Sequence, residues 1–303
     1  MATLTGTVTS VKQLLQVIAS FATDPTKFPG GKEWKLKSPA VIASTTDEVI
    51  LMGIGDGNDE IYVGMKIEVQ GSQENILLNG YAGYDPFLEW FEQPGSLYEV
   101  EKDNKYPCLA LPSDVKLSYW LTANTQRITV HVEASNQYHC AYLGFFDPIS
   151  VERQYPYPML IGGDTVQGQL WNDTRETHSA YFAPKIIDGG YSSMIIRRPD
   201  GVWEYGGKNL QIWPTDHSIE DTFVVYDKDV DSSSSSVDHM LFPMMIYEKN
   251  PTGIFGKLDG VYWIGNRADL ASKDSVIYRG KTYKVFDNVN KRGDQDYHVV
   301  EWA

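Results

Sequence analysis

The stretch "VKLSYWLTANTQRITVHVEASNQYHCAYLGFF", residues 115 to 146, decides the fold. It contains three runs that are rich in β-branched and aromatic residues, and asparagine-containing turns separate them. In the middle run Ile128, Val130 and Val132 alternate with polar side chains, which is the period of a strand that buries one face. The stretch therefore predicts three consecutive antiparallel strands. Arg127 and His131 fall on the opposite face, so we expect His131 to be solvated rather than a ligand.

The stretch "EVILMGIGDGNDEIYVGMKIEV" predicts a second antiparallel pair, a hairpin over residues 48–69. Ile61, Val63, Met65, Ile67 and Val69 form its expected buried face. The glycine-rich residues 53–59 superficially suggest a phosphate-binding loop. Such a loop needs a helix directly after it, whereas an alternating strand follows here, so we interpret the segment as a hairpin turn.

One helix is expected, at residues 9–22. Apolar residues recur there at helical spacing, and Thr9 or Ser10 can cap the first turn. The apolar face consists of Val11, Leu14, Leu15, Ile18 and Ala22. Asp24-Pro25 ends the helix.

The 303 residues include 19 Tyr, 8 Trp and 11 Phe together with 26 Gly and 15 Pro. Many aromatics with frequent turns indicate a mainly β fold of antiparallel sheets, sandwich-like or barrel-like, with one N-terminal helix. The expected parts are an N-terminal helix at 1–24, a β-rich domain at 25–164, a second β-rich region at 165–250 with a serine-rich loop at 231–237, and a small C-terminal β module of four to five strands at 251–303.

The net charge of −14 disfavours nucleic acid as a partner, because phosphate contacts need clustered Lys and Arg. It suits solubility or a partner with a basic patch. The sequence has no run of 18 apolar residues, so no membrane insertion is expected. The N-terminal "VKQLLQVIASFA" lacks the features of a signal peptide, so we expect synthesis and folding in the cytoplasm.

No cofactor, metal site or catalytic residue is predicted. Cys108 and Cys140 form no CxxC motif; a buried free thiol is expected at Cys140, and a Cys108–Cys140 bridge stays open. The segment "DKDVDSSSSSVD" at 227–238 imitates a calcium loop but lacks its glycine, its final glutamate and its helices. "WNDTRETH" at 171–178 gathers acidic groups and a histidine, which we attribute to chance among 40 acidic residues.

Aromatic residues are the strongest chemical bias, since Tyr and Trp combine a large apolar face with a polar tip. Three explanations compete: filling of a β core, protein–protein interfaces, and platforms for host-surface glycans. The interface candidates are Tyr81, Tyr84, Trp90, Tyr155, Tyr157, Trp171, Trp203 and Trp213.

The segment "RQYPYPMLIGGD", residues 153–164, predicts a rigid corner. Pro156 and Pro158 force the preceding tyrosines into extended geometry, so one tyrosine is expected to pack on the sheet that ends at "YLGFF". A short strand at 159–161 should follow, and the two glycines should end it. The corner is expected to take the chain from one sheet to the next.

Several phrases resemble a family of tailed-bacteriophage virion proteins: "YWLTANTQRITV" (119–130), "YLGFF" (142–146), "QYPYP" (154–158), "LDGVYW" (258–263) and "KTYKVFDNV" (281–289). The resemblance covers most of residues 45–165 and 255–301. It implies a non-enzymatic structural protein of the tail, baseplate or neck, which assembles with other virion proteins and with copies of itself into a symmetric oligomer. It implies no catalytic residues.

Two other functions stay open: a tail-tip module that binds receptors or glycans, and a glycan-degrading enzyme. For a structural protein of the particle, the N-terminal helix and residues 232–236 are candidates for segments that order only in the assembly. The expected location is the virion, assembled in the bacterial cytoplasm.

Overall fold

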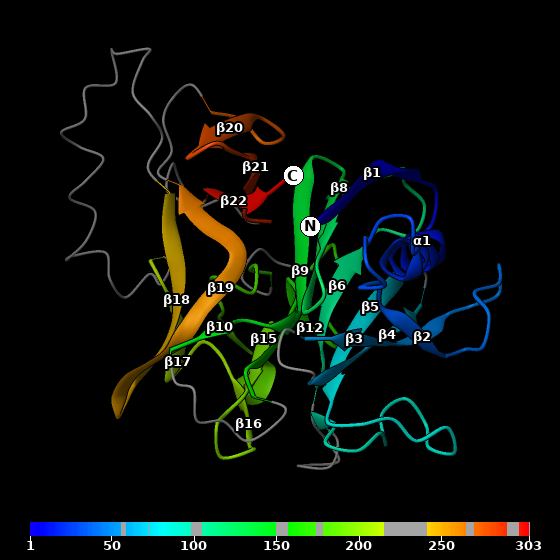
Figure 1. Ribbon diagram of the computed structural model, residues 1–303, viewed down its shortest axis with the longest axis horizontal. Coiled ribbons are helices and arrows are strands. Elements are labelled where there is room, and N and C mark those ends of the chain that lie inside the picture. The colour runs from blue at the N-terminus through cyan, green and yellow to red at the C-terminus, as the bar shows by residue number, and fades with distance from the viewer. Residues whose placement is uncertain are drawn as a thin grey trace.

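The computed structural model describes residues 1–55, 59–71, 73–97, 105–149, 157–173, 178–214, 241–264, 270–289 and 297–302. In these residues the chain is mainly β, with antiparallel sheets and one α-helix, so the predicted fold class is confirmed. The strands form three large sheets, here called A, B and C. In Figure 1 most of sheet A is green, most of sheet B is blue to cyan, and most of sheet C is gold to red.

Sheet A has seven strands in the order β1-β7-β8-β9-β11-β15-β16. Their bounds are Ala2–Val8 (β1), Leu117–Ala123 (β7), Arg127–Ala134 (β8), Gln137–Phe145 (β9), Met159–Gly162 (β11), Met194–Arg197 (β15) and Trp203–Tyr205 (β16). All its pairings are antiparallel, and β1 forms one edge.

Sheet B has six strands in the order β12-β6-β5-β4-β3-β2. Their bounds are Thr165–Val166 (β12), Pro107–Leu111 (β6), Gln73–Tyr81 (β5), Glu60–Gln70 (β4), Glu48–Ile54 (β3) and Lys35–Ser38 (β2).

Sheet C has the order β17-β18-β19-β22-β21-β20, and β10 also pairs with β19. Their bounds are Leu210–Trp213 (β17), Leu241–Lys249 (β18), Thr252–Ile264 (β19), Tyr297–Glu301 (β22), Lys281–Asp287 (β21), Ser275–Tyr278 (β20) and Asp147–Pro148 (β10). A small pair, Ile186–Ile187 (β13) with Tyr191–Ser192 (β14), flanks a 3-10 turn at Asp188–Gly190.

Sheet A is the central layer, because each of its faces belongs to a different buried cluster. Val130 and Leu143 lie in the core shared with sheet B and the helix, whereas Cys140 and Tyr142 lie in the core shared with sheet C. A third, smaller cluster lies among the C-terminal strands of sheet C. This arrangement leaves no solvent-facing side at the middle of sheet A.

The three strands predicted from residues 115–146 are confirmed as β7, β8 and β9. The prediction that His131 is solvated is wrong: Arg127, Thr129 and His131 are buried. Alternation identified the two faces of β8 correctly, but sheet C covers the polar face, and it does so through residues more than 100 positions away in the sequence.

The predicted hairpin at 48–69 is confirmed, with Glu48 opposite Lys66 and Ile54 opposite Glu60. Its burial differs from the prediction at three places. Tyr62 and Gly64, on the expected polar face, are buried, whereas Val69, on the expected apolar face, is 67% exposed near the strand end.

Helix α1 spans Val11–Thr23 and buries all five residues of its predicted apolar face. Ser10 is the N-cap, and its hydroxyl accepts a hydrogen bond from the backbone N–H of Gln13 at 3.1 Å. The helix is therefore folded and packed in the single chain, so the expectation that it orders only in an assembly is not met.

Replacing Ser10 with Ala should lower the free energy of unfolding by about 1 kcal/mol, because the Gln13 N–H loses its acceptor. Ser10→Asp should restore most of the loss, since a carboxylate also caps a helix. Chemical unfolding followed by circular dichroism measures both. A Ser10→Ala variant as stable as the wild type would contradict the capping role.

The predicted strand at 159–161 is confirmed as part of β11, but the change of sheet is more elaborate than expected. The chain leaves sheet A after β9, adds β10 to sheet C, and returns to sheet A as β11. The step into sheet B comes later, at Gly163, whose N–H donates to Ser193 O, and Asp164, whose N–H donates to Cys108 O.

The expected C-terminal module is present as four strands, β19 to β22, but these strands share sheet C with β17 and β18. The expected boundary at 250/251 falls in the turn between two paired strands, because Lys249 lies opposite Thr252. The boundary at 164/165 lies between β11 of sheet A and β12 of sheet B. The serine-rich loop at 231–237 lies outside the described residues.

Candidate interaction site

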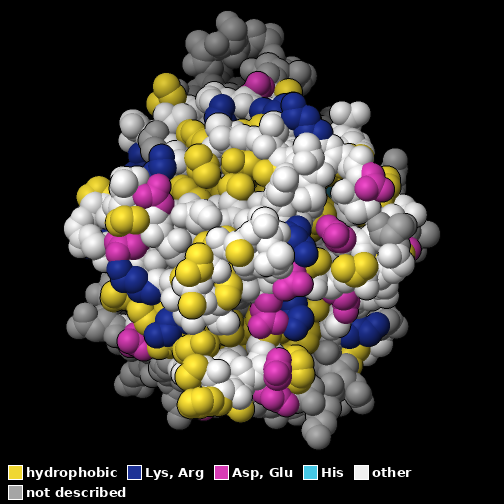
Figure 2. Space-filling view, turned by 90° about the vertical axis from the view of Figure 1, so that its right-hand side faces the viewer, with side chains coloured by type: hydrophobic (Ala, Val, Ile, Leu, Met, Phe, Trp, Pro, Cys, Tyr) yellow, Lys and Arg dark blue, Asp and Glu magenta, His cyan; other side chains and the backbone are white. Residues whose placement is uncertain are grey.

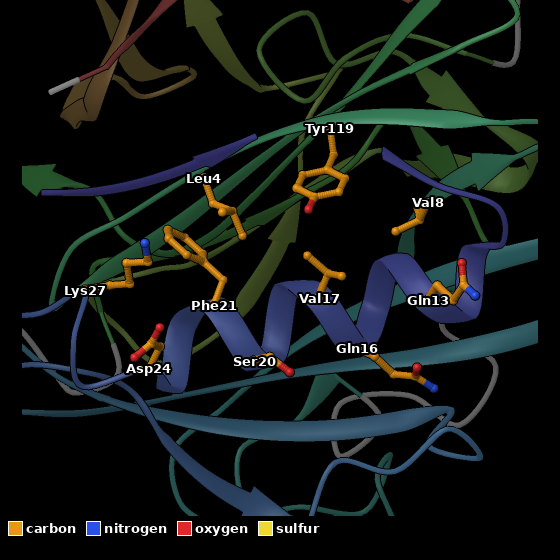
Figure 3. A pocket seen from close by; sticks show the side chains of 10 residues that line it. All are labelled: Leu4, Val8, Gln13, Gln16, Val17, Ser20, Phe21, Asp24, Lys27 and Tyr119. Carbon is orange, nitrogen blue, oxygen red and sulfur yellow. The ribbon is translucent and has the colours of Figure 1, made fainter. Parts of the chain in front are cut away.

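A groove of about 460 Å³ lies between helix α1 and the edge of sheet A. Leu4, Val8, Val17, Phe21 and Tyr119 provide its apolar lining. Figure 3 shows Val17 and Phe21 rising from the helix toward Leu4 and Tyr119, with the Tyr119 hydroxyl pointing down into the gap. Figure 2 views the molecule from the side of α1, and hydrophobic side chains gather in a hollowed patch on that face.

The local sequence explains why this side of the helix is apolar. Val17 and Phe21 are four positions apart, so they lie above one another on one side of α1, next to the stripe that packs into the core. Val17 is only partly buried, while the Phe21 ring also packs against Phe28, 6.1 Å away. The groove is thus a continuation of the core that the chain leaves open.

Strand β1 supplies the opposite wall. Leu4, Gly6 and Val8 share one face and lie opposite Leu121, Tyr119 and Leu117 of β7. Gly6 makes room for the tyrosine, since a Cβ there would lie 2.4 Å from the Tyr119 hydroxyl oxygen. Burial raises the pKa of Tyr119, so its hydroxyl stays protonated and can donate a hydrogen bond at neutral pH.

The remaining lining is polar: Gln13, Gln16, Ser20, Asp24 and Lys27. Its two charged groups lie at one end of the groove, beyond Phe21 (Figure 3). Asp24 accepts hydrogen bonds from the Thr26 hydroxyl and backbone N–H, which lower the pKa of its carboxyl. The rest of the groove carries no charge, so its middle suits an uncharged, partly apolar ligand.

The structure places four of the eight aromatic interface candidates in the interior. Tyr81, Trp90, Tyr157 and Trp203 are each at most 5% exposed. Tyr81 and Trp90 meet edge to face at 6.2 Å. These four rings therefore fill the core of the single chain and are not accessible on its surface.

The other four candidates differ. Tyr84, Trp171 and Trp213 are partly exposed, whereas Tyr155 lies outside the described residues. The ammonium group of Lys37 lies 5.4 Å from the centre of the Tyr84 ring. Tyr84, Trp171 and Trp213 do not line the groove.

Tyr157 is the tyrosine that packs on the end of β9: its ring meets Phe146 edge to face at 5.6 Å, and its hydroxyl donates to Phe255 O at 3.0 Å. Tyr157→Phe should therefore lower the free energy of unfolding by about 1 kcal/mol, through loss of one buried hydrogen bond. Urea unfolding measures the change, and Tyr84→Phe serves as a partly exposed control. Equal effects in the two variants would contradict the proposed role of the hydroxyl.

An ion pair joins sheets A and C in their shared interior. The Nε of Arg127 donates to Asp259 Oδ2 at 3.0 Å, and the Asn124 side chain donates to the same oxygen at 2.6 Å. Arg127 Nη1 donates to the Thr122 hydroxyl at 2.8 Å. Gly260 follows Asp259 with φ +67°, and a Cβ there would lie 2.0 Å from Arg127 Nη2. The phrase "LDGVYW" thus supplies the acceptor and the space that the buried guanidinium needs.

A buried imidazole pair joins the same two sheets. The Nε2 atoms of His131 and His298 lie 2.8 Å apart, so the Nε2–H of one ring donates a hydrogen bond to the Nε2 of the other. His131 also stacks on Phe286, with ring centres 4.3 Å apart. Burial lowers the pKa of both histidines, that of His298 to about 3, so the pair is neutral at neutral pH.

A third polar contact joins sheets A and B. His139 Nδ1 hydrogen-bonds Asp164, whose other oxygen accepts the backbone N–H of Ala110 at 3.1 Å. Cys108 and Cys140 are both free and buried, so the structure has no Cys108–Cys140 bridge. Burial, followed by the charge of Asp164, raises the pKa of both thiols. The His139–Asp164 contact therefore holds the sheets together, and the two thiols are buried away from solvent.

Within "WNDTRETH", the described residues Asp173 and His178 both hydrogen-bond the backbone of Leu170. Asp173 accepts the backbone N–H of Leu170 at 2.5 Å, and His178 Nε2 donates to the Leu170 carbonyl at 2.8 Å. Both side chains therefore support one turn, while Glu176 lies outside the described residues.

The calcium-like segment at 227–238 also lies outside the part of the chain that the structure describes. Within that part, no group of three His, Cys, Asp or Glu side chains is placed to hold a metal ion. Among the described residues no helix has both the length and the apolar character needed to cross a membrane.

Sequence patterns did not locate the groove. Val17 and Phe21 look like extra core residues of an amphipathic helix, and residues 2–8 carry only weak alternation. The available signal was a helix whose apolar stripe is wider than packing against one sheet requires. This helix directly follows a short uncharged segment.

Comparison with known proteins identifies no relative, because no family model matches the chain and a search of curated proteins finds no match.

Proposed function

We propose that this chain is a non-enzymatic structural subunit of a tailed-bacteriophage particle, in its tail, baseplate or neck. It acts through contacts with other virion proteins and with copies of itself. The observation that carries the proposal is the groove beside β1, an apolar surface next to an open sheet edge. Such a surface suits binding of another polypeptide. The phage-like phrases at residues 119–146 and 258–289 are the reason for proposing a phage particle as the assembly.

The polar groups of the interior fit this role. Arg127, His131 and Asp259 form contacts between sheets A and C. They give the subunit a fixed shape, which a symmetric assembly requires of its repeated parts. The proposed location is the virion, with assembly in the bacterial cytoplasm.

Mass spectrometry of purified, gradient-fractionated particles tests the proposal. We expect peptides of this chain in the particle fraction, at a constant ratio to the other virion proteins. Particles formed without the gene should lack a substructure or fail to assemble. Normal, infectious particles without the gene would overturn the proposal.

The second candidate is a glycan-binding module at the tail tip, which the partial exposure of Trp171 and Trp213 supports. Such rings can stack on sugars. A glycan array with the wild type, Trp171→Ala and Trp213→Ala tests it: binding that each variant weakens supports the function, and an array without wild-type binding rejects it. A glycan-degrading activity would have to disappear in Asp173→Asn, which the structural role of Asp173 in its turn does not favour.

A further inference from the structure

The outer side of strand β1 is an open edge within the described residues. β1 is the last strand of sheet A and pairs with β7 alone. A strand at the edge of a sheet presents a row of backbone N–H and C=O groups to one side, and these groups can pair with a further strand. The groove lies directly beside this edge.

The two features fit one ligand geometry. A strand added to β1 would place every second side chain on the same face as Leu4, Gly6 and Val8. That face looks toward Val17 and Phe21 of the helix (Figure 3). An added strand would therefore pair its backbone with β1 while its alternate side chains fill the apolar groove. This combination of edge pairing and side-chain pockets is a recurring way to bind extended peptides.

Charge indicates which kind of partner supplies the strand. Strand β1 has the sequence ATLTGTV, with no charged residue, and the only charged groups of the groove lie at one end. The whole chain carries −14, from 26 Lys and Arg against 40 Asp and Glu. The net charge of the chain as a whole attracts a basic protein, so at this groove it favours a basic partner over a second copy with the same charge.

We propose that the groove between α1 and β1 binds an extended, uncharged segment of a basic partner protein, which adds as a further strand to sheet A. The inference deepens the proposed function, because it names the partner class for a subunit of an assembly. Apolar residues at alternate positions of the segment occupy the space lined by Val17, Phe21 and Tyr119.

Fluorescence anisotropy with the purified full chain tests the proposal. The probe is a labelled peptide with four Val and three Thr in strict alternation, and two Lys flank this stretch at each end. A second peptide has the same composition but four consecutive Val, and therefore lacks the alternation. Two further versions carry N-methyl groups on all Val or on all Thr, so that each blocks hydrogen bonding along one edge of the strand.

We expect saturable binding of the alternating peptide and at least about tenfold weaker binding of the blocked-sequence peptide, because apolar side chains on both faces cannot all enter the groove. One N-methylated version should bind and the other should not. Equal binding of the two N-methylated versions, or of the two sequences, would overturn strand addition.

Two matched variants locate the site. Val17→Asp should weaken binding at least about tenfold, although it adds a negative charge that attracts the lysines. Val41→Asp makes the same change at a residue that is 73% exposed and outside the groove, and should leave binding unchanged. Circular dichroism checks that both variants fold.

Loss of binding in both variants, or in neither, would contradict the groove as the site. The two proposals fail in different ways. Absence of the chain from particles rejects the proposed function. If the chain is present in particles but does not bind the peptide, only the strand-addition inference is rejected.

Discussion

Replacing Asp259 with Ala should lower the free energy of unfolding by about 3 kcal/mol, because it leaves the buried guanidinium of Arg127 without its counter-charge. The Arg127 side chain is 1% exposed and that of Asp259 is 22% exposed, so water reaches the site only from the Asp259 side. Asn124 also loses its acceptor. Urea unfolding at neutral pH, followed by tryptophan fluorescence, measures the loss.

Two further variants test the explanation. Removing both charges with Arg127→Met and Asp259→Ala should recover most of the stability, since an apolar pair avoids the cost of an unpaired buried charge. Glu92→Ala, at an exposed site, should change stability by less than about 0.5 kcal/mol. The account would be contradicted if Asp259→Ala cost no more than Glu92→Ala.

Acid should destabilise the protein through the His131–His298 pair. The folded state holds both imidazoles neutral, whereas the unfolded chain titrates near pH 6.5, so below that pH the unfolded state binds more protons. The stability that the neutral His131–His298 pair contributes is fully present above about pH 6.5 and is lost as the pH falls toward about 3. For His298 alone the loss is about 2 kcal/mol at pH 5, and His131 adds to it in the same direction.

The double variant His131→Leu, His298→Leu isolates this contribution. It should be nearly as stable as the wild type at pH 7.5, because both hydrogen-bonding partners are replaced together, and it should lose much less stability by pH 5. His298→Leu alone should cost about 1–3 kcal/mol at pH 7.5, since His131 then keeps a buried unpaired nitrogen. A double variant with the same pH dependence as the wild type would refute the role of the pair.

The structure explains why the sequence predicts the strands better than the faces they bury. Alternation in residues 127–134 identifies a strand and its two faces, because the period of two is a local property. The residues that cover the polar face of this strand are distant from it in the sequence. Arg127 finds Asp259 and His131 finds His298 across more than 100 residues, and no spacing in the sequence reports such a contact.

The same reason limits the prediction of the site. The aromatic residues most visible in the sequence, such as Trp90 and Trp203, are core residues, because a three-layer β fold needs large side chains between its sheets. The groove depends instead on Val17 and Tyr119, which are unremarkable in the sequence. They meet because β1 and α1 pack against β7, more than 100 residues later in the chain.

We propose that this chain builds into a particle through the groove beside β1. Photo-cross-linking in assembled particles is the decisive experiment, with a photoreactive amino acid at position 17 in one preparation and at position 41 in another. We expect a cross-link from position 17 to one basic virion protein, identified by mass spectrometry, and none to that protein from position 41. Particles that contain the chain but give no cross-link from position 17, or the same cross-link from both positions, would refute assembly through the groove.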